Sequence, residues 1–179
     1  MRKIIEYTVV SADGVFGSEG LTGLGNYQDE AYRRDGLGQL LACDAMLLGR
    51  GTYEFFSKLY PSLTDPWAVR VNAMPKYVFS STLDNAAWDN TTIVRGDVVA
   101  EAARLKQQEG RDLLIWGHGR FAQTLLEQRL IDVLDISVYP FMAGHGELLF
   151  RPGQEASLRL VTTKTFSKGI VKLTYEPKR

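Results

Sequence analysis

The feature that most constrains the fold of this chain is the stretch 112–121, which reads DLLIWGHGRF. Residues 113–116 form a continuous apolar run, which is typical of a strand buried on both faces of a sheet. Residues 117–119 end that run with two glycines, and a helical spacing of apolar residues begins at Arg120. The stretch therefore predicts a strand, a glycine turn and a helix in direct succession.

A strand, a glycine turn and a helix together present free backbone N–H groups and the positive end of a helix dipole to an anion. Gly117 and Gly119 would let a phosphate approach the backbone closely, because they carry no side chain. We therefore predict that this turn binds the pyrophosphate of a dinucleotide. The alternative is a plain tight connection, since the full G-x-G-x-x-G pattern is absent and Ala122 stands at its last position.

The composition indicates a soluble globular protein and gives no sign of a nucleic-acid or membrane partner. The 179 residues suit a single domain spanning 1–179, with 45% hydrophobic and 23% charged residues. Lys plus Arg equals Asp plus Glu at 21 each, so any anion site must be local. No apolar stretch approaches the ~20 residues that a membrane helix needs.

Cys43 is the only cysteine, which excludes an internal disulfide and a cysteine-based zinc cluster. We predict no metal site, and we expect Cys43 to pack in the core. The N-terminus reads as a strand and lacks the apolar segment of a signal peptide, so a cytoplasmic location is expected.

Strand patterns alternate with helical patterns along most of the chain. Strands are predicted at residues 3–10, 44–48, 76–79, 91–94, 113–116, 133–139, 158–166 and 169–175. Helices are predicted at 28–42, at 52–58 with Thr52 as a cap, at 98–109 and from 120 onward, with an irregular segment or short helix at 61–73. This order predicts an α/β fold with a mostly parallel central sheet, helices on both faces and an antiparallel C-terminal hairpin.

Three predicted strands end in residues suited to an anion. They are followed by GRGT at 49–52, SST at 80–82 and GHG at 117–119. Ligands of such sheets bind beyond the carboxyl ends of the strands, so three turns of this kind at one edge would form a nucleotide cleft.

Several segments match a known family in its own order. They are SADG at 11–14, LGRGTYE at 48–54, VFSSTL at 78–83, IWGHG at 115–119, LID at 130–132, YP at 139–140 and GHGELLF at 144–150. With these segments the chain resembles the dihydrofolate-reductase-like superfamily. It is most similar to the branch that contains the reductase domain of the bifunctional riboflavin-biosynthesis deaminase/reductase and its stand-alone relatives.

The resemblance implies a dihydrofolate-reductase-like three-layer fold, NADPH as cofactor and, in many relatives, a homodimer. Carried over by position, the expected cofactor contacts are the turn Gly49, Arg50, Gly51 and Thr52 at the phosphates; Ser80, Ser81 and Thr82 near the adenosine; Gly117, His118, Gly119, Arg120 and Phe121 around the pyrophosphate; and Ala12 beside the nicotinamide.

The chain departs from this pattern at the central turn, at Asp132-Val133, where the family often has Asp-Glu, and in lacking the deaminase half. Dihydrofolate reductases have two adjacent glycines joined by a cis peptide at the central turn, whereas His118 takes the second position here. A cis bond that does not precede proline costs about 3–4 kcal/mol, so we do not assume one. The deaminase half is absent, because no His-x-Glu occurs with a Cys-x-x-Cys.

Individual residues leave two interpretations open. Arg50 either pairs with a 2′-phosphate, which would select NADP over NAD, or is a surface arginine. His118 either contacts the cofactor or fills space between turns, and Ser80 and Ser81 either donate to the phosphate or start a turn. Trp67 and Trp88 either wall a substrate pocket or cover the core. The glycine-rich loop 14–25 either closes over the site or is disordered.

Reduction of C=N or C=O also needs a proton donor, for which Asp29 and Asp13 are the candidates. Each could instead be a solvated or helix-start carboxylate. The resulting hypothesis is an NADPH-dependent oxidoreductase similar to dihydrofolate reductase and to phosphoribosylamino-uracil reductase. It would transfer hydride to a small heterocyclic (pterin or pyrimidine) or carbonyl substrate. The alternative is a non-catalytic nucleotide-binding or interaction protein that retains the reductase fold.

Overall fold

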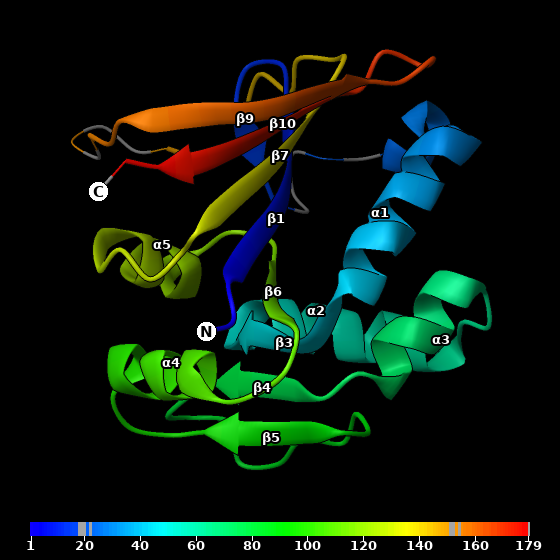
Figure 1. Cartoon of the computed structure of the whole chain (residues 1–179). Coiled ribbons are helices and arrows are strands. Elements are labelled where there is room, and N and C mark those ends of the chain that lie inside the picture. Colours follow the sequence, from blue (N-terminus) through cyan, green and yellow to red (C-terminus); the bar gives the residue numbers. More distant parts are fainter. Residues whose placement is uncertain (18–20, 22, 151–152, 154, 179) are drawn as a thin grey trace.

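The structure is a computed structural model that describes residues 1–17, 21, 23–150, 153 and 155–178 (Figure 1). The strands are β1 (Ile4–Ser11), β2 (Val15–Phe16), β3 (Cys43–Gly49), β4 (Lys76–Phe79), β5 (Thr91–Val94), β6 (Asp112–Trp116), β7 (Val133–Tyr139), β8 (Glu147–Leu148), β9 (Leu158–Thr165) and β10 (Val171–Pro177). The helices are α1 (Glu30–Ala42), α2 (Arg50–Leu59), α3 (Pro66–Ala73), α4 (Val98–Gln107) and α5 (Arg120–Glu127), with 3-10 turns at Leu24–Tyr27 and Tyr60–Ser62.

Eight strands form one sheet in the order β5-β4-β3-β6-β1-β7-β10-β9. The six neighbouring strands β5, β4, β3, β6, β1 and β7 run parallel, whereas β10 pairs antiparallel with both β7 and β9. The hairpin between β9 and β10 turns at Gly169, whose φ of 91° suits glycine. The mostly parallel sheet and the antiparallel C-terminal hairpin confirm the predicted fold class.

Helices cover both faces of the sheet and bury a core on each side (Figure 1). On one side α4 and α5 pack against Leu113 and Ile115 of β6. On the other side α1, α2 and α3 pack against a second core that includes Leu114. Consecutive residues of β6 thus enter opposite cores, which explains why its sequence is a continuous apolar run. Cys43 is fully buried in the second core, as predicted.

Most element bounds agree with the predictions within two residues, and the differences have local causes. The cap predicted at Thr52 is wrong: α2 begins at Arg50, after Gly49, so Thr52 lies inside the first turn. The segment 61–73 contains a regular helix, α3, which is capped by Asp65 and has proline in its first turn. The short pair β2 and β8 was not predicted, because a strand of two residues is too short to show a hydrophobic periodicity.

Part of the glycine-rich loop, residues 18–20 and 22, lies outside the described residues. The predicted closure of this loop therefore stays a prediction. Among the residues that the structure describes, no helix has the length and apolar character needed to cross a bilayer.

Candidate functional site

A cavity of about 1540 Å³ opens where β3 and β6 end, and its wall includes the first residues of both α2 and α5. The two strands are neighbours in the sheet, with Leu47 beside Ile115, so the turns that follow them lie side by side. An ideal Cβ on Gly49 would lie 3.2 Å from the Cβ of Phe121. A Cβ on Gly117 would lie 3.8 Å from Thr52 Oγ1. The two glycine turns thus form one continuous wall, and a side chain at position 49 would crowd it.

The helices differ in how their N-termini are capped. The carboxylates of Asp29, Asp65 and Asp97 accept hydrogen bonds from first-turn N–H groups of α1, α3 and α4. Helices α2 and α5 follow Gly49 and Gly119 instead, and within the described chain neither receives a side-chain cap. Their first N–H groups therefore remain available to an anion in the cavity, and both helix dipoles point their positive ends there.

The third turn, after β4, contacts the first through Arg50. The guanidinium of Arg50 donates to Thr82 Oγ1 at 2.5 Å and to Glu54 Oε1 at 2.6 Å. Ser80 Oγ accepts from the backbone N–H of Thr82 and Leu83, which is the turn-forming role that its sequence allowed. The three predicted turns are therefore brought together, although Ser80, Ser81 and Thr82 are not among the described residues that line the cavity.

The side chain of His118 points away from solvent and pairs with Glu6 of β1. Its Nδ1 lies 2.5 Å from Glu6 Oε1, both side chains are 1% exposed, and Phe16 packs edge-on against the imidazole. His118 Nε2 and Glu6 Oε2 are buried without a hydrogen-bond partner among the described residues. The sequence signal for Glu6 was a carboxylate inside an otherwise apolar strand, and the sequence interpretation missed it.

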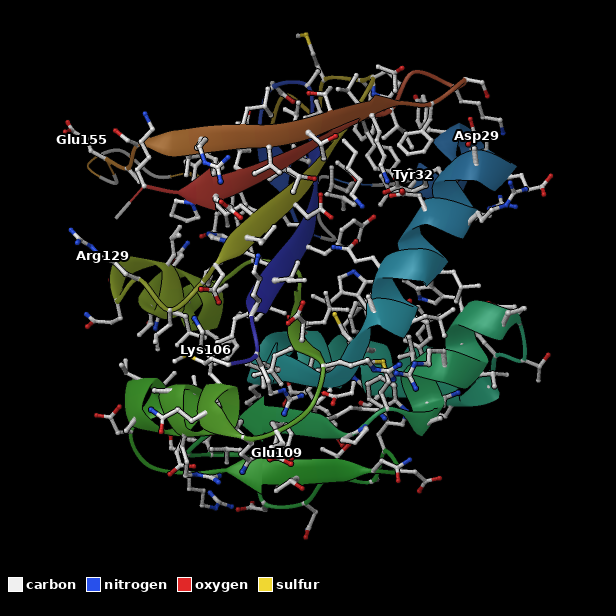
Figure 2. All side chains as sticks on the ribbon, viewed as in Figure 1. Asp29, Tyr32, Lys106, Glu109, Arg129 and Glu155 are labelled. Carbon is white, nitrogen blue, oxygen red and sulfur yellow. The ribbon has the colours of Figure 1, made fainter. Side chains whose placement is uncertain are left out.

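The two carboxylates considered as proton donors are already engaged elsewhere. Asp29 caps α1 and accepts from Ser167 N and Oγ, at the end of α1 next to the β9–β10 turn (Figure 2). The hydrogen bond from Ser167 is the main cause that lowers the pKa of Asp29. Asp13 accepts from Ser11 Oγ and from the N–H groups of Ala143 and Gly144, which lower its pKa to about 2.

Neither carboxylate reaches the large cavity. Asp29 is not among the described residues of its wall, and Asp13 lines a second, smaller cavity of about 410 Å³ together with Ala12. Both groups are ionised at neutral pH, because hydrogen bonds to the charged form lower their pKa. The structure thus offers no support for either as a proton donor, and it separates Ala12 from the glycine turns.

The half of the cavity away from the glycine turns is lined by aromatic rings. Trp116 lies at its centre, with ring centroids 4.7 Å from Phe56, 5.0 Å from Trp67 and 5.7 Å from Tyr60. Trp67 rests on Gly36 of α1, where an ideal Cβ would lie only 2.9 Å from the indole. Trp67 therefore walls the cavity, whereas Trp88 is buried in the core.

Three tyrosines on the same cavity wall share their hydroxyl groups. Tyr7 bonds Tyr32, Tyr139 donates to Tyr32 at 3.2 Å, and Gln28 donates to Tyr139 at 3.0 Å. The cluster joins β1, α1 and β7, three elements that no sequence spacing connects. The sequence interpretation missed it for that reason.

A family model described as the RibD C-terminal domain matches residues 2–172 of the chain. The chain belongs to this family. The match confirms the resemblance to the reductase domain of the riboflavin-biosynthesis enzyme. In this member of the family, the cavity lies at the carboxyl edge of the mostly parallel sheet.

Known proteins resemble this member of the RibD C-terminal domain family over most of its length. The uncharacterized protein YyaP of Bacillus subtilis is 31% identical over 140 residues, which cover 74% of this chain and 73% of YyaP. A structure of a candidate riboflavin biosynthesis protein from Shewanella sp. PV-4 superposes with a TM-score of 0.75 at 23% identity, covering 99% of each chain. The Thermotoga maritima deaminase/reductase superposes with a TM-score of 0.71 at 15% identity, covering 99% of this chain and 57% of that one. These structures share the reductase-like fold.

Proposed function

We propose that the protein is an NADPH-dependent reductase that acts on a small heterocyclic (pterin or pyrimidine) or carbonyl substrate. The observation that carries the proposal is the pair of uncapped helix N-termini, after Gly49 and Gly119, on the wall of one large cavity. Two neighbouring helix ends suit a ligand with linked phosphates, such as a dinucleotide. Membership of the RibD C-terminal domain family supports the same assignment.

The residues present fit such a cofactor. The turns at Gly49 and Gly119 leave backbone N–H groups open to the pyrophosphate, and Arg120 and Phe121 line the cavity beside them. Arg50 adds positive charge to this wall, and its contacts with Thr82 and Glu54 fix the guanidinium where a 2′-phosphate would bind. A reduced nicotinamide bound in the cavity would supply a hydride to the substrate.

The aromatic half of the cavity suits a flat substrate. Phe56, Trp67 and Trp116 offer ring faces and edges, which favour stacked or edge-on contact with a conjugated ring. Such a surface fits a pterin, a pyrimidine or a conjugated carbonyl compound. The protein's task is to hold that ring next to the cofactor and to keep water away.

Arg50→Ala tests the cofactor assignment. We expect the variant to lose affinity for NADPH about 10-fold or more and to keep its affinity for NADH, because only NADPH carries the 2′-phosphate. Calorimetric titration with both dinucleotides measures this. Arg104→Ala on α4 is the matched control, because it also removes an exposed arginine paired with a glutamate of its own helix. Equal losses for NADPH and NADH in Arg50→Ala would refute the phosphate role.

The alternative is a protein that binds the dinucleotide without catalysis. It is favoured by the engagement of the two carboxylates in the described cavity wall, because Glu30 pairs with Arg34 and Asp65 caps α3. Oxidation of NADPH in the presence of dihydrobiopterin, diaminouracil and menadione distinguishes the two. We expect at least one of these probes to be reduced. Dinucleotide binding without turnover on any probe would favour the alternative.

We also propose that the protein is a homodimer. Strand β9 is an edge of the sheet and is almost wholly exposed, with Leu160 52% and Val161 47% accessible. An exposed apolar edge strand is a surface for association with another chain. Sedimentation analysis should give the mass of two chains for the wild type and of one for Leu160→Lys. A monomeric wild type at micromolar concentration would contradict the proposal.

Finally, we propose that the protein works in the cytoplasm. Its single cysteine, Cys43, is a buried free thiol, which suits a reducing compartment but does not require one. Cell fractionation with an antibody against the protein would test this, and recovery from an oxidising compartment would contradict it.

A further inference from the structure

A chain of hydroxyl groups runs along the cavity wall and ends at Tyr7. Gln28 Nε2 can only donate, so Tyr139 accepts from it at 3.0 Å and has its own proton free to donate. Tyr139 donates to Tyr32 at 3.2 Å, and Tyr32 bonds Tyr7. When Tyr32 donates in turn to Tyr7, the proton of the Tyr7 hydroxyl is left without an acceptor in the chain. The order of donation thus directs one proton toward the open end.

Exposure excludes Tyr139 as the open end. Tyr139 is fully buried, whereas Tyr7 and Tyr32 keep 7% and 6% of their surface accessible, and all three belong to the cavity wall. The hydroxyl of Tyr32 already serves two neighbours, Tyr7 and Tyr139. Tyr7 bonds only one member of the hydroxyl chain, and the buried Ser137 Oγ next to it, which has no other partner among the described residues, competes with a bound molecule for the Tyr7 proton.

Tyr7 also stands where the glycine turn meets the aromatic wall. Its carbonyl oxygen accepts from the N–H of Gly117 at 2.8 Å, and its ring packs edge-on against Trp116 at 6.3 Å. The backbone bond to Gly117 fixes Tyr7 relative to the turn proposed to hold the cofactor.

The surroundings of Tyr7 keep its hydroxyl protonated. Burial is the main cause that raises the pKa of Tyr7 above its ordinary value; hydrogen bonds with Tyr32 and Ser137 lower it in part, and nearby Tyr139 and Asp135 raise it. The ammonium of Lys172 lies 5.8 Å from the Tyr7 ring but is paired with Asp35 and Asp135, so it adds little net positive charge. Tyr7 therefore has a proton to give at neutral pH, unlike Asp13 and Asp29.

We propose that Tyr7 is the proton donor of the reduction and that Tyr32 and Tyr139 are positioning residues, of which Tyr32 also resupplies the proton; this inference rests on the proposed function. As hydride reaches the carbon of a C=N or C=O group, the O–H bond of Tyr7 breaks and an N–H or O–H bond forms on the substrate. The electron pair stays on the Tyr7 oxygen, which takes the proton of Tyr32. One solvent proton per turnover then restores Tyr32 from the cavity, where Tyr7 and Tyr32 keep accessible surface.

The test uses Tyr7→Phe and Tyr32→Phe in the full-length protein, with Tyr53→Phe as control. Tyr53 is also a buried tyrosine, and its hydroxyl accepts a hydrogen bond from the Trp88 N–H, but it is not among the described residues of the cavity wall. The rate of NADPH oxidation is measured with dihydrobiopterin, diaminouracil and menadione. General acids contribute about 100- to 10,000-fold to a rate. We therefore expect Tyr7→Phe to lower the rate of NADPH oxidation by that factor, with the probe that the wild type reduces, and Tyr32→Phe to lower it less.

Three readouts besides activity separate a catalytic role from a structural one. NADPH affinity by calorimetry and the melting temperature should stay near the wild-type values in Tyr7→Phe. Binding of the substrate probe to the dinucleotide-free protein should change the ultraviolet absorbance of tyrosine. This difference signal should vanish in Tyr7→Phe and persist in Tyr53→Phe. Should Tyr7→Phe not fold, a slowed Tyr32→Phe with unchanged NADPH affinity would support the chain.

The inference is overturned if Tyr7→Phe reduces the probe at the wild-type rate, if Tyr53→Phe slows equally, or if the slower rate is matched by an equal loss of NADPH affinity. Failure of the proposed function looks different. In that case the wild type itself binds no NADPH or reduces none of the three probes, and the inference falls with it.

Discussion

Gly117→Ala provides the sharpest separation of backbone strain from ligand binding at the central turn. Gly117 has a φ of 80°, and its added Cβ would meet only Thr52 Oγ1 at 3.8 Å, an ordinary contact. The cost to folding is therefore conformational, about 1–2 kcal/mol for an L-residue in the left-handed region. For a chain of this length that lowers the melting temperature by about 2–8 °C.

The effect on ligand binding should be separate and larger. The methyl group would stand where a phosphate approaches the backbone, at the cost of about one charge-assisted hydrogen bond, or roughly 1.5–3 kcal/mol. This raises the Kd for NADPH about 10- to 150-fold. Gly144→Ala is the matched control, because Gly144 has a φ of 70° with open space around it and is not among the described residues of the large cavity.

Calorimetry with NADPH and thermal melting on both variants complete the test. We expect both to lose similar stability and only Gly117→Ala to lose NADPH affinity. If the two variants bind NADPH equally well, or if both bind it equally poorly, the reasoning about the turn is refuted.

Two further predictions concern stability. The folded-state pKa of Asp13, about 2, lies below its ordinary 3.8, so the stability that Asp13 contributes is present above about pH 4 and is lost as the pH falls toward 2. Denaturant unfolding at a series of pH values should show this loss in the wild type and a smaller loss in Asp13→Asn. Identical pH profiles for the two proteins would contradict the prediction. His118→Leu leaves the Glu6 carboxylate buried without its partner, which we expect to cost about 3–5 kcal/mol of unfolding free energy. The double variant with Glu6→Leu should recover most of that loss, and a cost below about 1 kcal/mol for His118→Leu alone would show that the pair contributes little.

The fold and the position of the cavity could be predicted from the sequence because both follow from local patterns. The apolar run of β6 and its glycine turn marked a central strand, and parallel strands must end at the same edge. The sequence alone therefore predicts that Gly49, Ser80 and Gly117 lie at one edge of the sheet. The error at Thr52 arose because capping rules look for a side-chain oxygen, whereas the true N-cap, Gly49, has none.

The chemistry inside the cavity depended on contacts between distant segments. Glu6 and His118 are 112 residues apart in the sequence, and Tyr32 and Tyr139 are 107 residues apart. No periodic pattern in the sequence predicts either contact. Trp67 and Trp88 looked alike in sequence, yet only Trp67 faces the cavity, because Gly36 leaves room for its indole. Asp13 and Asp29 were plausible acids until their hydrogen-bond donors were known.

A crystal structure of the protein with NADPH bound tests the central claim most directly. The account predicts density for the pyrophosphate between the N-termini of α2 and α5, within hydrogen-bonding distance of the backbone N–H groups that follow Gly49 and Gly119. It also predicts the 2′-phosphate beside Arg50. Density for the dinucleotide elsewhere on the molecule, or none at saturating NADPH, would contradict it.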